Sequence, residues 1–102
     1  MIHFVAFYKH PEDVAAFDKA YWETHIPLIK KVPGLQNVAA HKFWPGKEGP
    51  APYYMMAVLS FADKDAFKAG MKSPEMAEAG ANLMSFAKGF VEFQTTETVT
   101  GA

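Results

Sequence analysis

The sequence predicts an α+β domain of the ferredoxin-like βαββαβ class, in which an antiparallel four-stranded sheet carries two main helices on one face. Short apolar segments rich in aromatic and β-branched residues alternate with two longer amphipathic segments in that order. Half of the 102 residues are apolar or aromatic, which suits one core. Because no repeat, linker or low-complexity tract divides the chain, residues 1–102 are expected to form a single domain.

The first half of the chain predicts a strand and a helix. Residues 2–8 (IHFVAFY) are apolar at both alternating sets of positions, which is typical of a strand buried on both faces. A helix is expected to begin near Pro11, because proline is tolerated in a first turn and apolar residues then recur at helical spacing. Pro27 has no amide hydrogen, so we expect the helix to kink or break there and to end at Pro33–Gly34.

The second half follows from the same rules. Apolar runs indicate strands, clusters of proline and glycine indicate loops, and aspartate or serine before an amphipathic stretch indicates the start of a helix. The expected elements are a strand at 35–44, a loop at 45–52 (PGKEGPAP), a strand at 53–61, a short helix from Asp63 to Gly70, a main helix from Ser73–Pro74, and a strand at 90–99.

This arrangement leaves one face of the sheet uncovered. The helices can cover only one side, yet the strands at 2–8 and 53–61 are apolar on both. We therefore expect a homodimer in which two sheets pack face to face and form a dimeric α/β barrel.

Composition argues against several classes of partner. The net charge of −1 gives no basic surface for nucleic acid or an anionic membrane, and all ten cations are lysine, without the arginine that favours phosphate groups. No apolar run approaches the ~20 residues that span a bilayer. The absence of cysteine excludes thiol chemistry and fits a reducing cytoplasm, where we expect the protein to work.

Motifs for common cofactors and nucleophiles are missing as well. The four histidines are scattered, with no spacing that gathers metal ligands on one helical face. There is no G-x-S-x-G sequence, no phosphate-binding glycine loop and no dinucleotide fingerprint. Hydrolase and dehydrogenase functions are therefore not indicated.

His25 stands out, because it lies on the apolar face of the first helix within YWETHIPL. An apolar side chain would pack there at lower free-energy cost than a polar ring. An imidazole titrates near neutral pH, so His25 is a candidate general acid/base. The alternative is a core histidine whose hydrogen bonds are satisfied. Tyr21 shares its face and could contact a flat ligand, whereas Tyr53 and Tyr54 should point to opposite sides of the sheet.

The segments PEDVAAFDKAYWETHIPLIKKVPGL and SPEMAEAGANLMSFAKG resemble EthD-type proteins, named for ethyl tert-butyl ether degradation. The marks of the resemblance are an aromatic pair, then H-x-P-L, then P-G. It implies a dimeric α/β barrel whose members, where a reaction is assigned, rearrange or cyclise small oxygenated compounds without metal or organic cofactor. It also implies His25 as the reactive residue. Many relatives carry tyrosine at the position of Val38 and aspartate at that of Asn82.

These observations lead to a cofactor-free isomerase, cyclase or lyase acting on a small, mostly apolar carbonyl or lactone compound. Two alternatives stay open: a non-catalytic ligand-binding or accessory barrel that supports an oxygenase pathway, and haem or oxygen chemistry of the kind found in other dimeric α/β barrels. The residues expected to form the site are His25 as general acid/base and, as ligand-binding residues, Tyr21, Trp22, Val38, Tyr54, Leu83 and Phe86, with no metal and no cofactor.

Overall fold

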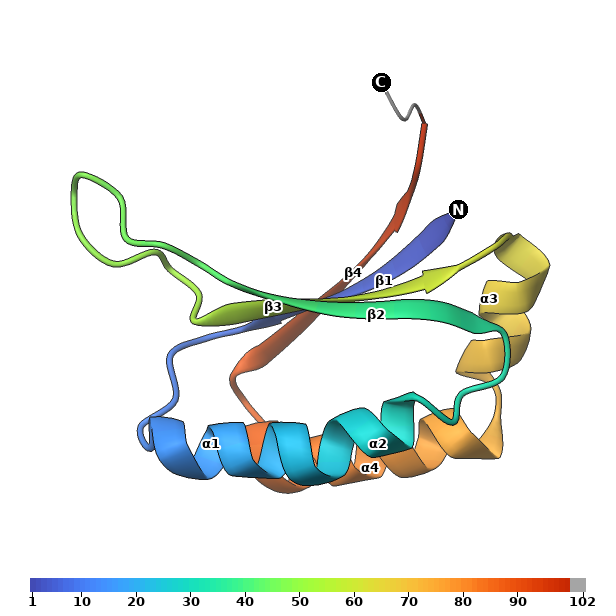
Figure 1. Ribbon diagram of the computed structural model, residues 1–102, viewed down its shortest axis with the longest axis horizontal. Coiled ribbons are helices and arrows are strands. Elements are labelled where there is room, and N and C mark those ends of the chain that lie inside the picture. Colours follow the sequence, from blue (N-terminus) through green and yellow to red (C-terminus); the bar gives the residue numbers. More distant parts are fainter. Residues whose placement is uncertain (100–102) are drawn as a thin grey trace.

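The structure, a computed structural model, describes residues 1–99 and has the predicted βαββαβ order, with additional helical segments (Figure 1). The helices of residues 14–29 and 74–87 lie beneath one face of the sheet, the short helix of residues 64–71 stands at one end of the strands, and the other face carries no helix. The elements are β1 (Ile2–Tyr8), α1 (Val14–Ala20), the π-helical segment η1 (Tyr21–His25), α2 (Ile26–Ile29), β2 (Leu35–Lys42), β3 (Met55–Phe61), α3 (Lys64–Met71), α4 (Pro74–Ala87) and β4 (Val91–Glu97).

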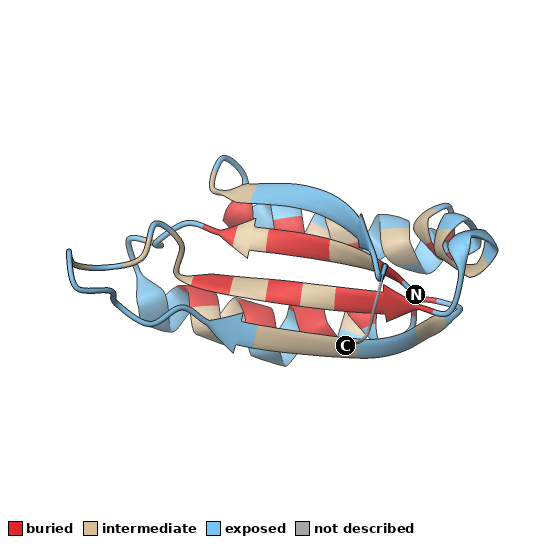
Figure 2. Cartoon of the chain, turned by 90° about the horizontal axis from the view of Figure 1, so that it is seen from above, coloured by how far each residue is buried: buried red, intermediate tan, exposed pale blue. Residues whose placement is uncertain are grey.

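The sheet is antiparallel throughout, with strand order β2-β3-β1-β4. Strands β1 and β3 occupy its centre, as expected for the two segments that are apolar on both faces. Their register pairs Ala6 with Ala57 on the face toward the helices and Val5 with Val58 on the opposite face. Figure 2 shows the buried residues concentrated in these two strands, whereas β2 and β4 at the edges are more exposed.

The hydrophobic core lies between the sheet and the helices and has two parts. One part surrounds Phe17 and Tyr21 near the start of the first helix, and the other surrounds Ile29 and Phe61 near its end. Ser73 caps α4 as predicted, since its hydroxyl accepts the amide hydrogen of Met76. The apolar sides of α1 and α4 thus pack against one face of the sheet.

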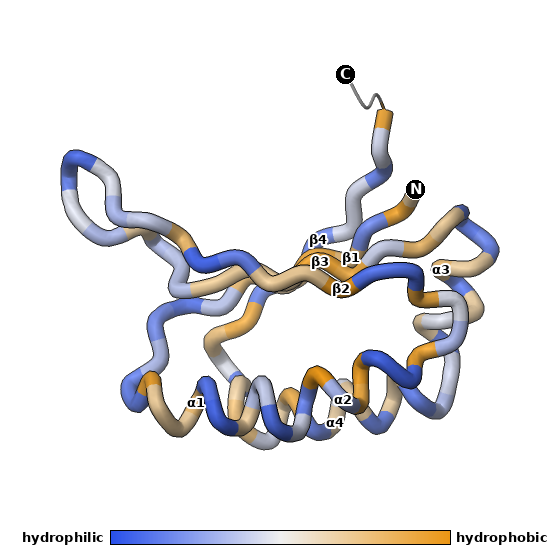
Figure 3. Tube along the Cα trace, in the orientation of Figure 1, coloured by the Kyte–Doolittle hydropathy of each residue, from blue (hydrophilic) through white to orange (hydrophobic). Residues whose placement is uncertain are grey.

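The uncovered face is apolar only along its centre. Val5 and Val58 lie there, but His3 also belongs to this face, and its ring bonds the Ser60 hydroxyl at 2.8 Å and the Thr98 hydroxyl at 2.7 Å. Figure 3 shows hydrophobic positions in the middle of the sheet, where the strands overlap in this view, and hydrophilic positions in the loop between β2 and β3. The apolar part of the uncovered face is therefore a central band that includes Val5 and Val58, and the face is not apolar throughout.

The β2–β3 hairpin is longer than the sequence predicted. The strands end at Lys42 and resume at Met55, so residues 43–54 form a loop that projects beyond the sheet (Figure 1). Gly46 and Gly49 exchange two backbone hydrogen bonds of 2.9 and 3.3 Å, which close its tip. Within the described residues, no helix has the length and apolarity needed to cross a membrane.

The short helix α3 does not end at Gly70, as its sequence suggested, but includes it. A β-carbon at Gly70 would lie 2.7 Å from a ring carbon of Phe61 and 2.9 Å from the carbonyl oxygen of Pro33. Glycine is therefore required here by close packing rather than by a left-handed backbone.

Candidate functional site

The first helical region contains a π-helical turn, which is wider than an α-helical turn. Residues Tyr21–His25 are π-helical, and the amide of Ile26 donates to the carbonyl of Tyr21, five residues earlier. The regular α-helix is thus interrupted just before Pro27, which lies in the first turn of α2, and α2 ends at Ile29, before the expected Pro33–Gly34. Such π segments occur frequently at functional sites. Here the segment turns both Tyr21 and His25 inward, where each is buried.

A cavity of about 320 Å³ lies between the sheet and the helices, beside this segment. Among residues 1–99, no charged side chain lines it, and the lining residues that carry nitrogen or oxygen in the side chain are His25, Tyr8 and Tyr21. Met84 on α4 and Phe93 on β4 are exposed lining residues, at 39% and 40%. The lining consists of Phe4, Ala6, Tyr8, Tyr21, His25, Ile26, Ile29, Ala57, Leu59, Met71, Met76, Gly80, Leu83, Met84 and Phe93.

His25 is 4% exposed and packs between aromatic rings, with centroid distances of 5.6 Å to Tyr21 and 6.1 Å to Phe86. Burial lowers the pKa of His25, and the Asn82 side chain and the Ala79 carbonyl oppose this effect in part. The imidazole is therefore neutral at pH 7 and able to accept a proton.

Two tyrosine side chains, Tyr8 and Tyr21, line the cavity together with His25. The rings of Tyr8 and Tyr21 meet edge to face at 5.5 Å, and burial raises the pKa of Tyr21 to about 12 and that of Tyr8 further still. Both phenols therefore stay protonated at neutral pH, and the interaction between their hydroxyls raises the pKa of Tyr8 and lowers that of Tyr21, as donation from Tyr8 to Tyr21 does. This leaves the Tyr21 hydroxyl able to donate to a ligand oxygen. Tyr8 was not among the predicted site residues, although strand alternation places it on the same face as Phe4 and Ala6.

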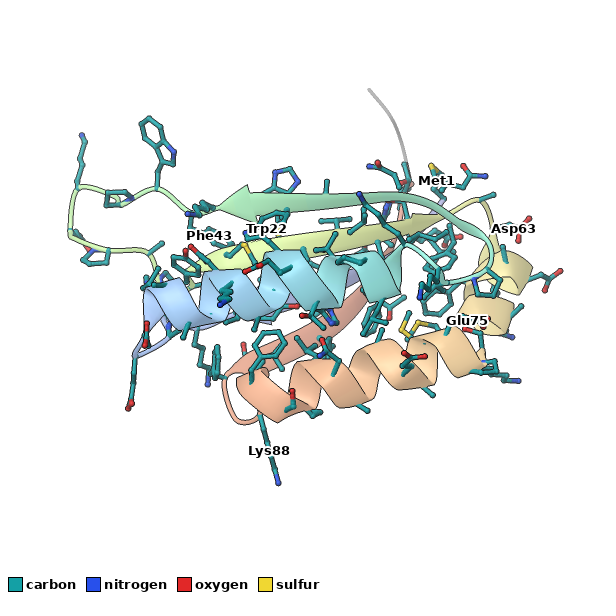
Figure 4. All side chains as sticks on the ribbon, turned by 60° about the horizontal axis from the view of Figure 1, so that its bottom comes forward. Met1, Trp22, Phe43, Asp63, Glu75 and Lys88 are labelled. Carbon is teal, nitrogen blue, oxygen red and sulfur yellow. The ribbon has the colours of Figure 1, made fainter. Side chains whose placement is uncertain are left out.

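Three of the predicted site residues meet at the cavity: His25, Tyr21 and Leu83. The other four do not line it. Trp22 is 48% exposed on the outside of the first helix, and Figure 4 labels it. Phe86 packs against the His25 and Phe17 rings, behind the cavity wall. Val38 is partly buried and packs against both parts of the core.

Tyr54 links the hairpin to the first helix instead of reaching the cavity. Its hydroxyl donates to the Asp18 carboxylate at 2.8 Å, and the Lys42 ammonium lies 5.3 Å from its ring centre. Tyr53 is on the opposite side of the sheet, as alternation predicted, where its hydroxyl donates to Glu92 at 2.8 Å. Tyr54 is thus a structural contact between elements that flank the site.

The remaining histidines lie elsewhere. His41 is exposed on the strand β2, on the face opposite Val38, and the His10 ring bonds the Ala51 carbonyl at 2.7 Å. Across residues 1–99, no group of three or more histidine, aspartate and glutamate side chains is placed to hold a metal ion.

Comparison with known proteins assigns this chain to a family. An uncharacterized 11.0 kDa protein from the thcB–thcC intergenic region of Rhodococcus erythropolis is 36% identical over 93 residues, which cover 91% of this chain and 90% of that protein. The crystal structure of an ethyl tert-butyl ether degradation (EthD) family protein from Bacillus halodurans has a TM-score of 0.92 and 29% identity, covering 97% and 99% of the two chains.

More distant structures share the fold. SnoaB, a cofactor-independent oxygenase from Streptomyces nogalater, has a TM-score of 0.70 and 15% identity, covering 97% of this chain and 93% of that one. A dimeric ferredoxin-like protein of unknown function from Jannaschia has a TM-score of 0.67 and 18% identity, covering 96% and 100%. The model of the EthD domain matches residues 9–89, which include η1 and most of the cavity lining. The chain is therefore a member of the EthD family.

Proposed function

We propose that the protein is a small enzyme of the isomerase, cyclase or lyase type, in which His25 accepts a proton from a neutral, mostly apolar oxygenated compound and returns it elsewhere on the molecule. The observation that carries this proposal is one neutral imidazole in a cavity otherwise lined by apolar groups and two phenols. Such a base can remove a proton from a carbon next to a carbonyl group without any cofactor.

The lining also defines the class of substrate. Without a cationic side chain at the wall, a carboxylate or phosphate group would lose its hydration with no compensating partner, so anionic ligands are disfavoured. A cavity of about 320 Å³ is at the small end of ligand sites, whose volumes run from roughly 300 to 1,000 Å³. The Tyr21 hydroxyl can hydrogen-bond the carbonyl or lactone oxygen while the carbon skeleton fills the apolar part.

A second candidate is a binding or accessory protein that holds such a compound without converting it. The observation that favours it is the scarcity of polar groups, since His25 is the only cavity residue whose charge changes near neutral pH. Oxygen chemistry is a further possibility for this fold, because SnoaB is a cofactor-independent oxygenase.

We also propose a homodimer that works in the cytoplasm. The central apolar band of the uncovered sheet face, which includes Val5 and Val58, would be hidden by a second copy. The dimeric ferredoxin-like neighbour supports the same arrangement. The lack of cysteine is compatible with a reducing compartment.

Exchange of hydrogen for deuterium tests the catalytic proposal without knowledge of the product. The protein is incubated in D2O with a panel of neutral ketones, 1,3-diketones and lactones, and deuterium at the carbon beside the carbonyl is measured by mass spectrometry. We expect exchange above the buffer rate for at least one compound, and its loss in His25→Gln, which keeps much of the side-chain volume but cannot act as a base at neutral pH.

His41→Gln is the matched control, because it removes an exposed histidine from the other face of the sheet. It should exchange at the wild-type rate. Exchange that persists in His25→Gln would exclude His25 as the base. Tight binding of a panel member, with no exchange in the wild type, would favour the accessory function.

A further inference from the structure

Two buried polar atoms lack a partner next to the cavity. Within residues 1–99, the buried side-chain nitrogen and oxygen atoms without a hydrogen bond are His25 Nδ1 and Asn82 Oδ1. A buried polar atom without a partner has lost its hydration with nothing in return, so each one calls for an explanation. Neither atom is used by the helix caps or by the sheet.

The two atoms belong to helices that pack together. His25 ends the π-helical segment, and Asn82 lies on α4, which contacts that segment along the layer below the sheet (Figure 1). Ala79 is one turn before Asn82 on α4 and is fully buried. The Asn82 side chain and the Ala79 backbone both raise the pKa of His25, as nearby acceptor oxygens do, although neither His25 Nδ1 nor Asn82 Oδ1 makes a hydrogen bond of good geometry. The acceptor oxygens near the imidazole therefore belong to α4.

The chemistry of these groups restricts which ring nitrogen carries the proton. A neutral imidazole has one N–H donor and one acceptor nitrogen, whereas a carbonyl oxygen can only accept. With the proton on Nδ1, one hydrogen bond to Asn82 Oδ1 would satisfy both unpaired atoms. With the proton on Nε2, two lone pairs would face each other in a dry interface. The amide oxygen of Asn82, and not its nitrogen, is the buried atom that lacks a partner.

We propose that Asn82 is a positioning residue that holds His25 with its proton on Nδ1, so that the unprotonated Nε2 is left to the cavity as the proton acceptor. This inference extends the proposed function and rests on it for its catalytic meaning. When Nε2 accepts a proton, the amide oxygen stabilises the resulting imidazolium by a hydrogen bond, as the third member of a nucleophile–base–orienter arrangement does. Because an amide carries no net charge, it leaves the resting pair neutral in apolar surroundings.

The pairing of His25 with an amide also restricts the class of substrate. An amide supports an imidazolium less strongly than a carboxylate does, so His25 remains a weak base, with its pKa lowered by burial. A weak base is matched to carbon acids whose anion is well stabilised, such as a carbon between two carbonyl groups. Compounds of that class are expected to exchange deuterium much faster than simple ketones.

The tautomer can be measured without any substrate. In protein labelled with ¹⁵N at histidine, two-bond ¹H–¹⁵N correlation spectra distinguish a protonated from an unprotonated ring nitrogen. We expect His25 in the neutral protein to show a protonated Nδ1 and an unprotonated Nε2. Asn82→Asp keeps the oxygen acceptor and adds a charge, so it should retain this tautomer and raise the pKa of His25 by about one pH unit or more.

Two variants complete the experiment. Asn82→Leu removes the acceptor and should give a mixture of tautomers with a lower pKa of His25. Asn37→Asp is the matched control, since it makes the same charge change at an exposed position on β2 and should leave His25 unaffected. A protonated Nε2 in the wild type, or equal titration of His25 in Asn82→Asp and Asn37→Asp, would overturn the proposal.

The result is independent of the test for function. If the tautomer is as expected but no compound exchanges deuterium, Asn82 still positions His25 and the catalytic proposal alone is lost. If exchange depends on His25 while the tautomer is reversed, the catalytic proposal stands and the role of Asn82 is lost.

Discussion

Gly80 offers a sharp test of whether the cavity is kept open for a ligand. It lies in the middle of α4, where glycine costs roughly 1 kcal/mol relative to alanine. A β-carbon at Gly80 would meet nothing within 4 Å, and the residue lines the cavity. Packing therefore does not require glycine at this position, and we infer that the missing side chain leaves room for a ligand.

The expected effects follow from that geometry. Gly80→Ala should raise the free energy of unfolding by about 0.5–1 kcal/mol, which corresponds to a melting temperature higher by roughly 2–8 °C for a domain of this size. Gly80→Leu should place its side chain in the cavity, keep the fold, and weaken the binding of any compound that exchanges deuterium with the wild type. Thermal unfolding followed by circular dichroism and titration with that compound would measure both effects.

Gly70 is the matched control, because it is also a helical glycine but has no free space. Its added β-carbon would meet Phe61 at 2.7 Å and Pro33 at 2.9 Å, so Gly70→Ala should destabilise the protein by about 1–3 kcal/mol. A Gly80→Ala variant that melted below the wild type would show that the space beside Gly80 is not free. A Gly80→Leu variant that bound the compound as tightly as the wild type does would show that the ligand does not occupy this space.

Three further predictions concern stability and assembly. Because burial lowers the pKa of His25 below its ordinary 6.5, the unfolded chain binds a proton more readily, and stability should fall as the pH is lowered through 6.5; His25→Gln should make unfolding by urea less sensitive to pH between 7 and 5. Light scattering should give twice the 11.3 kDa mass of one chain, and a monomer at micromolar concentration would contradict the homodimer. Tyr54→Phe should lower the free energy of unfolding by about 0.5–1.5 kcal/mol, because it removes the partly buried bond to Asp18. Tyr53→Phe, whose bond to Glu92 is exposed, should change it less.

The sequence by itself determined the order of the elements, because that order depends on local signals. The apolar run IHFVAFY predicted β1 with its observed bounds, and Ser73 followed by Pro74 predicted the start of α4. Caps and strand periodicity act between neighbours in the chain, so they can be recognised without knowledge of the tertiary structure. The H-x-P-L motif likewise singled out His25, which the structure buries at the cavity.

Only the tertiary structure decided what surrounds that histidine. Pro27 predicted a kink or break in the helix, and the structure shows that the interruption takes the form of a π-helical turn at Tyr21–His25, which propensity does not reveal. Tyr54 and Phe86, predicted as ligand-binding residues, do not line the cavity, since the Tyr54 hydroxyl bonds Asp18 and the Phe86 ring packs against Phe17. The proposed pairing of His25 with Asn82 joins residues 57 positions apart, and it depends on how η1 and α4 pack together, which no local pattern specifies.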